Sequence, residues 1–388
     1  MRLSLIALIA CLSATPAISA PCGGDFGDFL RAMAAEAVAE GLPQRAVDAF
    51  MAGARRDGAV IKADQSQGIF RKTFLEFSQS LISKNRINGA ARYSQKYDAT
   101  FKAAARSYGV SRGVILAFWA FETDFGQVQG DFNTRNALLT LAHDCRRPEM
   151  FQPQVLAAIA LTARGDIDPA NTIGAWAGEI GQVQMLPRDI LERGVDGDAD
   201  GQITLKTSAP DAILSASHML QFYGLRAGEP WLQEVTVPAG LDWSLTGLDT
   251  EMPAAKWAAM GVRAREGALA DLPGSILLPQ GRKGPAFIVY PNYRVLFEWN
   301  KSFVYVTTAA YFATRIEGAS PYDPGNPEPA LSAEATVMLQ KKLAAKGHDV
   351  GKIDGIIGAG TRRAVQAEQG RLGLPADGWP TAALLEAL

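Results

Sequence analysis

Apolar residues recur at helical spacing through the first half of the chain. In residues 25–40, Phe29, Met33 and Ala37 fall on one face of a helix. Ser111 offers an N-cap, and Gly126 a stop, for a further apolar run. We therefore expect helices over residues 25–40, 44–55, 70–87, 93–108, 111–126, 153–164 and 211–223.

The pattern changes after Trp231, where proline and glycine become frequent and short β-prone runs appear. Residues 287–290 and 293–297 flank Pro291 and Asn292, which predicts a hairpin or tight turn. Residues 303–308 form another β-prone run. Residues 318–329 are rich in proline and lack periodicity, as expected of a linker, and residues 330–388 then form a compact helical unit.

The apolar run at residues 113–127 contains a single carboxylate within its helix, Glu122. Burial disfavours the charged form of a carboxylate, so such a group tends to hold its proton near neutral pH. That is the property of a general acid for cleaving an acetal bond, although a capping or ion-pairing role fits this segment equally well. Asp124 lies roughly 200° further round the helix, so the two carboxylates are not a pair on one face.

Residues 173–187 contain three glycines that permit close backbone approach, together with Trp176, Gln182 and Gln184. An indole can stack on a sugar face and the amides can bind hydroxyl or acetamido groups; a tight helix crossing is the structural alternative. Glu179 in the same segment is a second candidate carboxylate.

Residues 196–203 place oxygen-bearing side chains at alternating positions with a glycine at the sixth, which is the start of a calcium loop. Thr207 stands where the usual glutamate would be, and Asp211 could close the site from the next helix. The alternative is an acidic solvated turn. We expect a structural calcium ion, with these ligands: Asp196, Asp198, Asp200, Gln202 and Asp211.

Composition and charge narrow the class of protein. The 388 residues are 48% hydrophobic, enough for a sizeable core, and the net charge of -2 without a basic block argues against nucleic acid as a partner.

Residues 1–19 have the form of a secretory signal, with Arg2, an apolar stretch and a small-x-small ending before a cut after Ser19. Periplasmic export therefore ranks above lipid anchoring at Cys11. The two remaining cysteines, Cys22 and Cys145, favour one disulfide over two free thiols.

Several motifs occur together in order: FETDFG at residues 121–126, WAGEIGQVQMLP at 176–187, the acidic loop, NYRVL at 292–296 and WNKS at 299–302. This set resembles the membrane-bound lytic transglycosylase B family, the lytic murein transglycosylases of glycoside hydrolase family 103, over about residues 26–313. The resemblance implies a mainly α fold over residues 20–317, with a lysozyme-like core, a helical N-terminal part and a small β insertion.

The resemblance also implies the chemistry. Members cleave the β-1,4 bond between N-acetylmuramic acid (MurNAc) and N-acetylglucosamine (GlcNAc) without water or a cofactor, leaving a 1,6-anhydro ring. Glu122 matches the single carboxyl that acts first as acid and then as base. The implied substrate contacts are Trp176, Gln184, Met185, Trp299, Asn300 and Tyr305.

The sequence departs from the family pattern at Trp299, where tyrosine is common, and at Met185, which replaces a phenylalanine, but three other departures matter more. Ala175 stands where serine is common, Glu179 where alanine is common, and His218-Met219 where an Asn-Tyr pair is common. These departures bear on the substrate contacts and not on the overall reaction.

The last unit resembles the three-helix type 1 peptidoglycan-binding domain, through Leu339-Gln340, the IDGIIG run at residues 353–358 and Thr361-Arg362. Glu368 replaces a common aromatic there. Such a module would hold an enzyme near its substrate.

The expected partners are peptidoglycan strands, and the expected state is a monomer, with other wall enzymes as unidentified partners. Two alternatives stay open. One is a hydrolytic muramidase that uses Glu179 to activate water. The other is a non-catalytic wall scaffold.

Overall fold

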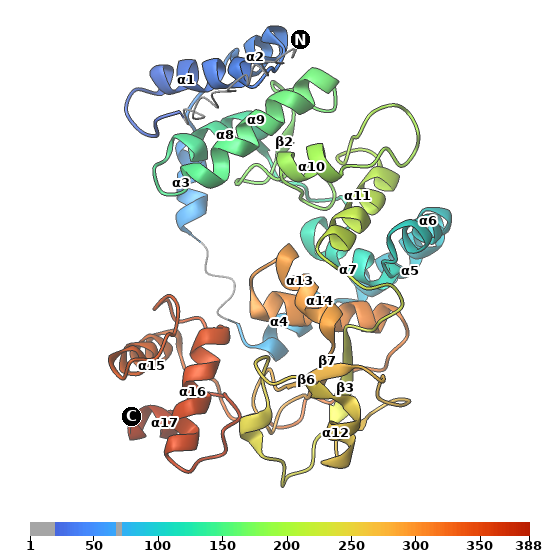
Figure 1. Ribbon diagram of the computed structural model, residues 1–388, viewed down its shortest axis with the longest axis vertical. Helices are drawn as coiled ribbons and strands as arrows, with labels where there is room; N and C mark the ends of the chain where they lie inside the picture. Colours follow the sequence, from blue (N-terminus) through green and yellow to red (C-terminus); the bar gives the residue numbers. More distant parts are fainter. Residues whose placement is uncertain (1–19, 67–71) are drawn as a thin grey trace, which may run out of the picture.

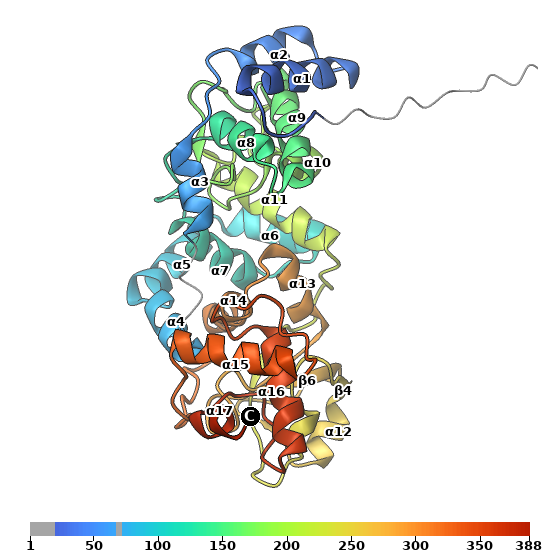
Figure 2. The same cartoon turned by 90° about the vertical axis from the view of Figure 1, so that its left-hand side faces the viewer.

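The computed structural model describes residues 20–66 and 72–388. The predicted signal peptide with Cys11, and part of the predicted helix at residues 70–87, lie outside them. The chain folds into an elongated molecule with the N-terminal helices at one end and a five-stranded sheet and the C-terminal helices at the other (Figures 1 and 2). No helix among the described residues is long and apolar enough to cross a membrane.

The N-terminal end is helical, and its buried residues form one hydrophobic cluster that includes Phe29, Phe50 and Phe151. The disulfide between Cys22 and Cys145 joins residues 123 positions apart in this region, which confirms the predicted pairing. The elements are α1 (Phe26–Ala39), α2 (Gln44–Met51), α3 (Gly58–Gln65), α8 (Thr134–His143), α9 (Pro148–Arg164) and the strands β1 (Phe132–Asn133) and β2 (Ile173–Gly174), which pair antiparallel.

The centre of the molecule is a second helical cluster built around α7 (Arg112–Thr123), whose residues from Gly113 to Ala120 are all buried. Helix α14 (Phe303–Ile316) packs along it. The remaining helices here are α4 (Phe74–Leu81), α5 (Lys84–Lys96), α6 (Asp98–Tyr108), α10 (Pro187–Arg193), α11 (Ala209–Phe222) and α13 (Pro291–Trp299).

A five-stranded antiparallel sheet in the order β4-β6-β7-β3-β5 lies below this core. Its strands are β3 (Leu232–Thr236), β4 (Met252–Pro253), β5 (Arg263–Ala264), β6 (Pro273–Leu277) and β7 (Phe287–Val289), with α12 (Ala254–Ala259) and the short 3₁₀ helix η2 (Trp243–Leu245) beside them. Val289 pairs with Leu232 on one side and Ser275 on the other. The sheet is the expected β insertion.

Two β predictions are wrong. Residues 293–297 belong to α13, in which Pro291 takes the first helical turn, where its missing N–H costs nothing. Residues 303–308 belong to α14, which is capped by the Ser302 side chain. β-Branched and aromatic residues dominate both segments, but burial against the core overrides this weak preference.

Several helix boundaries also differ from the prediction. The expected helix at residues 93–108 is divided between α5 and α6 at Tyr97, and α9 begins at Pro148, five residues before the predicted start. The Glu122 helix starts after Ser111 as predicted but ends at Thr123, three residues before Gly126.

The C-terminal unit contains α15 (Ala333–Ala345), α16 (Ala359–Arg371) and α17 (Ala382–Ala387), in agreement with the predicted three helices. Residues 317–332 contain no helix or strand, but they are fastened to the core. The Tyr322 hydroxyl pairs with Ser78, the Asn326 N–H donates to the Lys283 carbonyl, and Glu328 forms an ion pair with Lys283.

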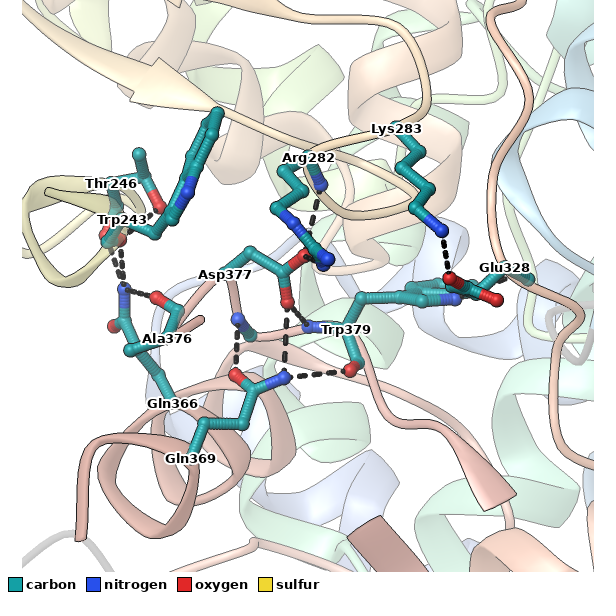
Figure 3. Close-up of polar contacts among 11 residues, drawn as sticks. Trp243, Thr246, Arg282, Lys283, Glu328, Gln366, Gln369, Ala376, Asp377 and Trp379 are labelled. Carbon is teal, nitrogen blue, oxygen red and sulfur yellow. Dashed lines mark hydrogen bonds and ion pairs between the residues drawn. The ribbon is translucent and has the colours of Figure 1, made fainter. Parts of the chain in front are cut away.

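The C-terminal unit is docked on the sheet side of the molecule (Figure 3). Asp377 accepts a hydrogen bond from the Arg282 N–H, and the Gln366 amide donates to the carbonyls of Trp243 and Thr246. Arg362 donates to the carbonyls of Leu278 and Pro279. These contacts fix the module in place, which differs from the loose tether that a proline-rich linker suggests.

Candidate active site at Glu122

Glu122 lies in the last turn of α7, held by the way that helix ends. Asp124 and Phe125 take left-handed backbone conformations, with φ of 50° and 61°. The Thr123 hydroxyl donates to the Gln182 carbonyl at 2.5 Å and accepts the Gly126 N–H at 2.8 Å. The helix end and the residue 176–187 segment are therefore fastened together immediately beside Glu122.

The carboxyl group of Glu122 receives two hydrogen bonds, both on the same oxygen. Oε1 accepts from the Trp299 indole N–H at 3.0 Å and from the Tyr305 hydroxyl at 2.5 Å. No hydrogen bond to Oε2 is formed among the described residues. A proton on the carboxyl group would therefore sit on Oε2, which is the oxygen free to transfer it to a substrate.

Aromatic rings surround this carboxyl. Trp299 stacks on Phe118 with ring centroids 4.6 Å apart, and Phe121 stacks on Phe312. Tyr305 is 7% exposed and meets Phe121 edge to face. One face of the Trp299 indole is thus covered by protein, so only its other face remains for the predicted stacking on a sugar.

The apolar surroundings raise the pKa of Glu122, because desolvation outweighs the two hydrogen bonds, which lower it. The pKa of Tyr305 is also raised well above its usual value, by burial first and by the nearby Glu122 charge second. Tyr305 therefore stays a hydroxyl donor at neutral pH. The two donors hold Glu122 in place, and desolvation favours its protonated form.

Asp124 has a different role. Its carboxylate forms an ion pair with Arg86 at 2.6 Å, and the Arg86 guanidinium also lies over the Phe121 ring. This agrees with the expectation that Asp124 does not share a face with Glu122. Arg86 had no signal in the sequence, because it stands 36 residues before Glu122 on a separate helix.

The predicted substrate-binding residues lie in different surroundings in the structure. The Asn300 side chain accepts the Ser302 N–H at 2.8 Å, and Gln184 donates from its amide to the Gly181 carbonyl. Met185 is 1% exposed and packs in the core, so it offers no surface to a sugar. Trp176 packs at the margin of the N-terminal cluster, apart from the aromatic rings around Glu122.

Glu179 is a second desolvated carboxyl near this site. Its Oε2 is buried and has no hydrogen-bond partner among the described residues. Desolvation, with a smaller contribution from the Glu122 charge, raises the pKa of Glu179 to about 7.

Two further residues that depart from the family pattern, His218 and Met219, contribute to packing. His218 stacks on Tyr108 and contacts the Arg193 carbonyl at 3.0 Å, while Met219 is buried in the core.

The acidic loop brings three of its five predicted metal ligands together. Carboxylate oxygens of Asp196, Asp198 and Asp211 lie within 4.8 Å of one another. Asp200 and Gln202 are exposed and lie outside this group, because the Asp200 carboxylate accepts the Gln202 N–H within the loop itself.

Asp211 is fully buried and desolvation raises its pKa, against the effect of its backbone hydrogen bonds. A set of hard oxygen donors around a desolvated carboxyl suits a calcium ion.

Comparison with known proteins places the chain in a family. The family described as Transglycosylase SLT domain matches residues 25–314, and a peptidoglycan binding domain matches residues 332–388. Membrane-bound lytic murein transglycosylase B of Escherichia coli K12 is 27% identical over 157 residues, 40% of this chain and 43% of that protein. The match to this curated relative thus spans less than half of its length.

Solved structures agree with this assignment. SltB3 of Pseudomonas aeruginosa, solved with NAG-anhNAM-pentapeptide, is 36% identical, with a TM-score of 0.85 over 94% of this chain and 99% of its own. The fold is also similar to that of lytic transglycosylase Slt35 of Escherichia coli, solved with calcium, at 23% identity, with a TM-score of 0.65 over 77% of this chain and 96% of that one. The chain therefore belongs to the lytic transglycosylase family of enzymes that act on peptidoglycan.

Proposed function

We propose that this protein cleaves the MurNAc-GlcNAc bond of peptidoglycan without water and leaves 1,6-anhydroMurNAc ends. One observation carries the proposal. Glu122 is a desolvated carboxyl whose Oε1 is fixed by Trp299 and Tyr305, while Oε2 makes no bond within the described protein. This is the arrangement of an acid that gives up a proton and takes one back at the same oxygen.

The steps balance without a second carboxylate. The Glu122 proton passes to the glycosidic oxygen, the bond from that oxygen to C1 of MurNAc breaks, and the sugar's own acetamido oxygen stabilises the positive C1. Glu122, now ionised, removes the proton from the C6 hydroxyl, and O6 closes on C1. Glu122 regains its proton and no water is consumed, whereas the common hydrolytic mechanisms use two carboxylates.

The decisive experiment is mass spectrometry of digested peptidoglycan. The wild-type chain should release anhydromuramyl ends, and Glu122→Gln should release almost none. Asp124→Asn is the matched control, because it changes the neighbouring carboxylate and should keep the product. Reducing muramyl ends would instead identify a hydrolase.

We also propose that Asp196, Asp198 and Asp211 hold a structural calcium ion and that the protein works in the periplasm after removal of residues 1–19. The carboxylate group around the buried Asp211 supports the calcium site. Calcium should raise the melting temperature of the wild type and have no such effect on Asp198→Ala. An equal rise in both would exclude this loop as the site.

A further inference from the structure

A cavity of about 650 Å³ lies between the catalytic region and the C-terminal unit. Trp299 and Asn300 line one side, and residues of the C-terminal unit, among them Lys352 and Asp354, line the other. Glu122 does not line the cavity, but it is one residue away from it, because Trp299 lines the cavity and its indole N–H donates to Glu122. Its volume falls in the range of sites that hold a ligand of a few linked residues.

The C-terminal wall of this cavity is held firmly. Gln340 is fully buried; its amide nitrogen donates to the Lys352 carbonyl, and its oxygen accepts the N–H groups of Asp354 and Gly355. The unit as a whole is fixed by its docking contacts with the sheet region (Figure 3). Lys352 therefore has a defined place relative to Glu122.

The cavity is lined by lysines from three separate segments. Lys72 precedes α4, Lys301 precedes α14 and Lys352 belongs to the C-terminal unit. Lys301 is paired with Glu298 at 2.7 Å, while Lys72 and Lys352 form no ion pair within the described residues. Asp354 is the carboxylate of the lining, and its Oδ1 accepts the Ile356 N–H. The balance of charge in the cavity is positive.

We propose that this cavity binds the anionic stem peptide of the muramyl residue beside the cleaved bond, with Lys72 and Lys352 recognising its carboxylates. The inference rests on the proposed function and adds where the peptide lies. A bare glycan presents hydroxyl and acetamido groups, with one lactyl carboxylate close to each muramyl ring. A stem presents several carboxylates further from the ring, which suits lysines that line the same cavity as Trp299.

The test compares two substrates made from one peptidoglycan sample: strands with their stems, and strands stripped of stems by an amidase. For Lys72→Glu/Lys352→Glu we expect kcat/KM to fall about tenfold on peptide-bearing strands and to change less than about twofold on bare strands. The loss should shrink as salt rises, because exposed charges are screened. Both side chains are exposed, so the melting temperature should match that of the wild type.

Two further variants serve as controls. Lys352→Arg should keep the preference for peptide-bearing strands, and Lys341→Ala, an exposed lysine on α15 outside the cavity lining, should change nothing. An equal loss on both substrates, or no loss on either, would overturn the proposal.

Failure of the proposed function would look different, because the wild type would then form no anhydromuramyl product from either substrate. In that event, calorimetric titration with GlcNAc-MurNAc-tetrapeptide and with the peptide-free disaccharide decides the question. Binding of the peptide form that the double variant loses supports the site, and equal binding by both proteins refutes it.

Discussion

Two desolvated carboxyls, the half-buried Glu122 and the fully buried Asp211, can be compared directly, because desolvation is the main influence that raises the pKa of both. They differ in their hydrogen bonds. In Asp211 both oxygens are occupied, one by the Gly197 N–H at 2.8 Å and the other by the Thr204 N–H at 2.7 Å. In Glu122 two side-chain donors share Oε1. The difference separates a carboxyl that organises a loop from one that keeps an oxygen for chemistry.

The largest expected effect comes from Glu122→Gln. The amide keeps an acceptor for Trp299 and Tyr305 but cannot supply a proton, so we expect turnover to fall about a thousandfold, within the usual range for a general acid. Release of anhydromuramyl products measures it.

The same variant has a second, opposite effect on stability. Because the folded pKa of Glu122 is raised, ionisation penalises the fold increasingly as pH rises above the unfolded value. Glu122→Gln should thus melt higher than the wild type at pH 8 and equally at pH 4. A lower melting temperature of the variant than of the wild type at pH 8 would show instead that the Glu122 carboxyl stabilises the fold.

Asp211→Asn should have the opposite effects: a loss of stability with little change in turnover. The substitution turns one acceptor into an N–H donor facing a backbone N–H, so a buried donor loses its partner at a cost of about 2 kcal/mol in the free energy of unfolding. Chemical denaturation with and without calcium measures it, and the calcium effect should vanish. Turnover per folded molecule should stay near wild type, and exposed Asp131→Asn should leave both quantities unchanged.

Tyr305→Phe tests what the donors on Oε1 contribute. The Tyr305 hydroxyl favours the carboxylate, so its removal raises the pKa of Glu122 further. Since the first step needs the protonated acid, the alkaline limb of kcat/KM should move to higher pH. We expect kcat to fall about tenfold, or about 1.4 kcal/mol, because the carboxyl loses one of its two anchors.

Tyr311→Phe is the matched control for that change. Tyr311 lies on the same helix and its hydroxyl accepts the Tyr322 N–H, away from Glu122. An equal pH shift in this control would show that the effect is one of packing and not of the hydrogen bond to the acid.

The sequence predicted the acid Glu122 better than it predicted the residues that surround Glu122. The capped apolar run around Glu122 is local, so Ser111 and the burial of the helix followed from nearby residues. The donors Trp299 and Tyr305 stand 177 and 183 positions away, and Tyr305 lies in a run whose residue types predicted a strand. Only the family resemblance related them to Glu122, since no local pattern carries a contact over that distance.

The acidic loop is a second case in which a local pattern did not predict the contacts made by the folded chain. Alternation predicted four ligands and the next helix a fifth, Asp211. The backbone of the loop takes up the Asp200 carboxylate, and the burial that distinguishes Asp211 arises from packing of α11. The docking of the C-terminal unit through Arg362 and Gln366 was likewise invisible, because polar contacts between distant segments have no period along the chain.

The smallest expected effect comes from a third desolvated carboxyl, Glu179, which can be compared with Glu122 and Asp211. Its pKa of about 7 means that ionisation penalises the fold as pH rises from 4.5 toward 7, so Glu179→Gln should stabilise the protein at pH 8 and not at pH 4. Its negative charge also disfavours ionised Glu122, so the variant's alkaline limb should move to lower pH by less than about one unit. Exposed Glu149→Gln should do neither.

Glu179→Gln also discriminates between the lyase and the hydrolase. A pKa near 7 suits a base that must accept a proton from water, so Glu179 is the carboxyl that a hydrolase would need. The lyase mechanism uses Glu122 alone, so under that mechanism the variant should keep forming anhydromuramyl ends at close to the wild-type rate. A variant that loses turnover while the wild type yields reducing ends would make Glu179 a water-activating base and Glu122 one member of a pair.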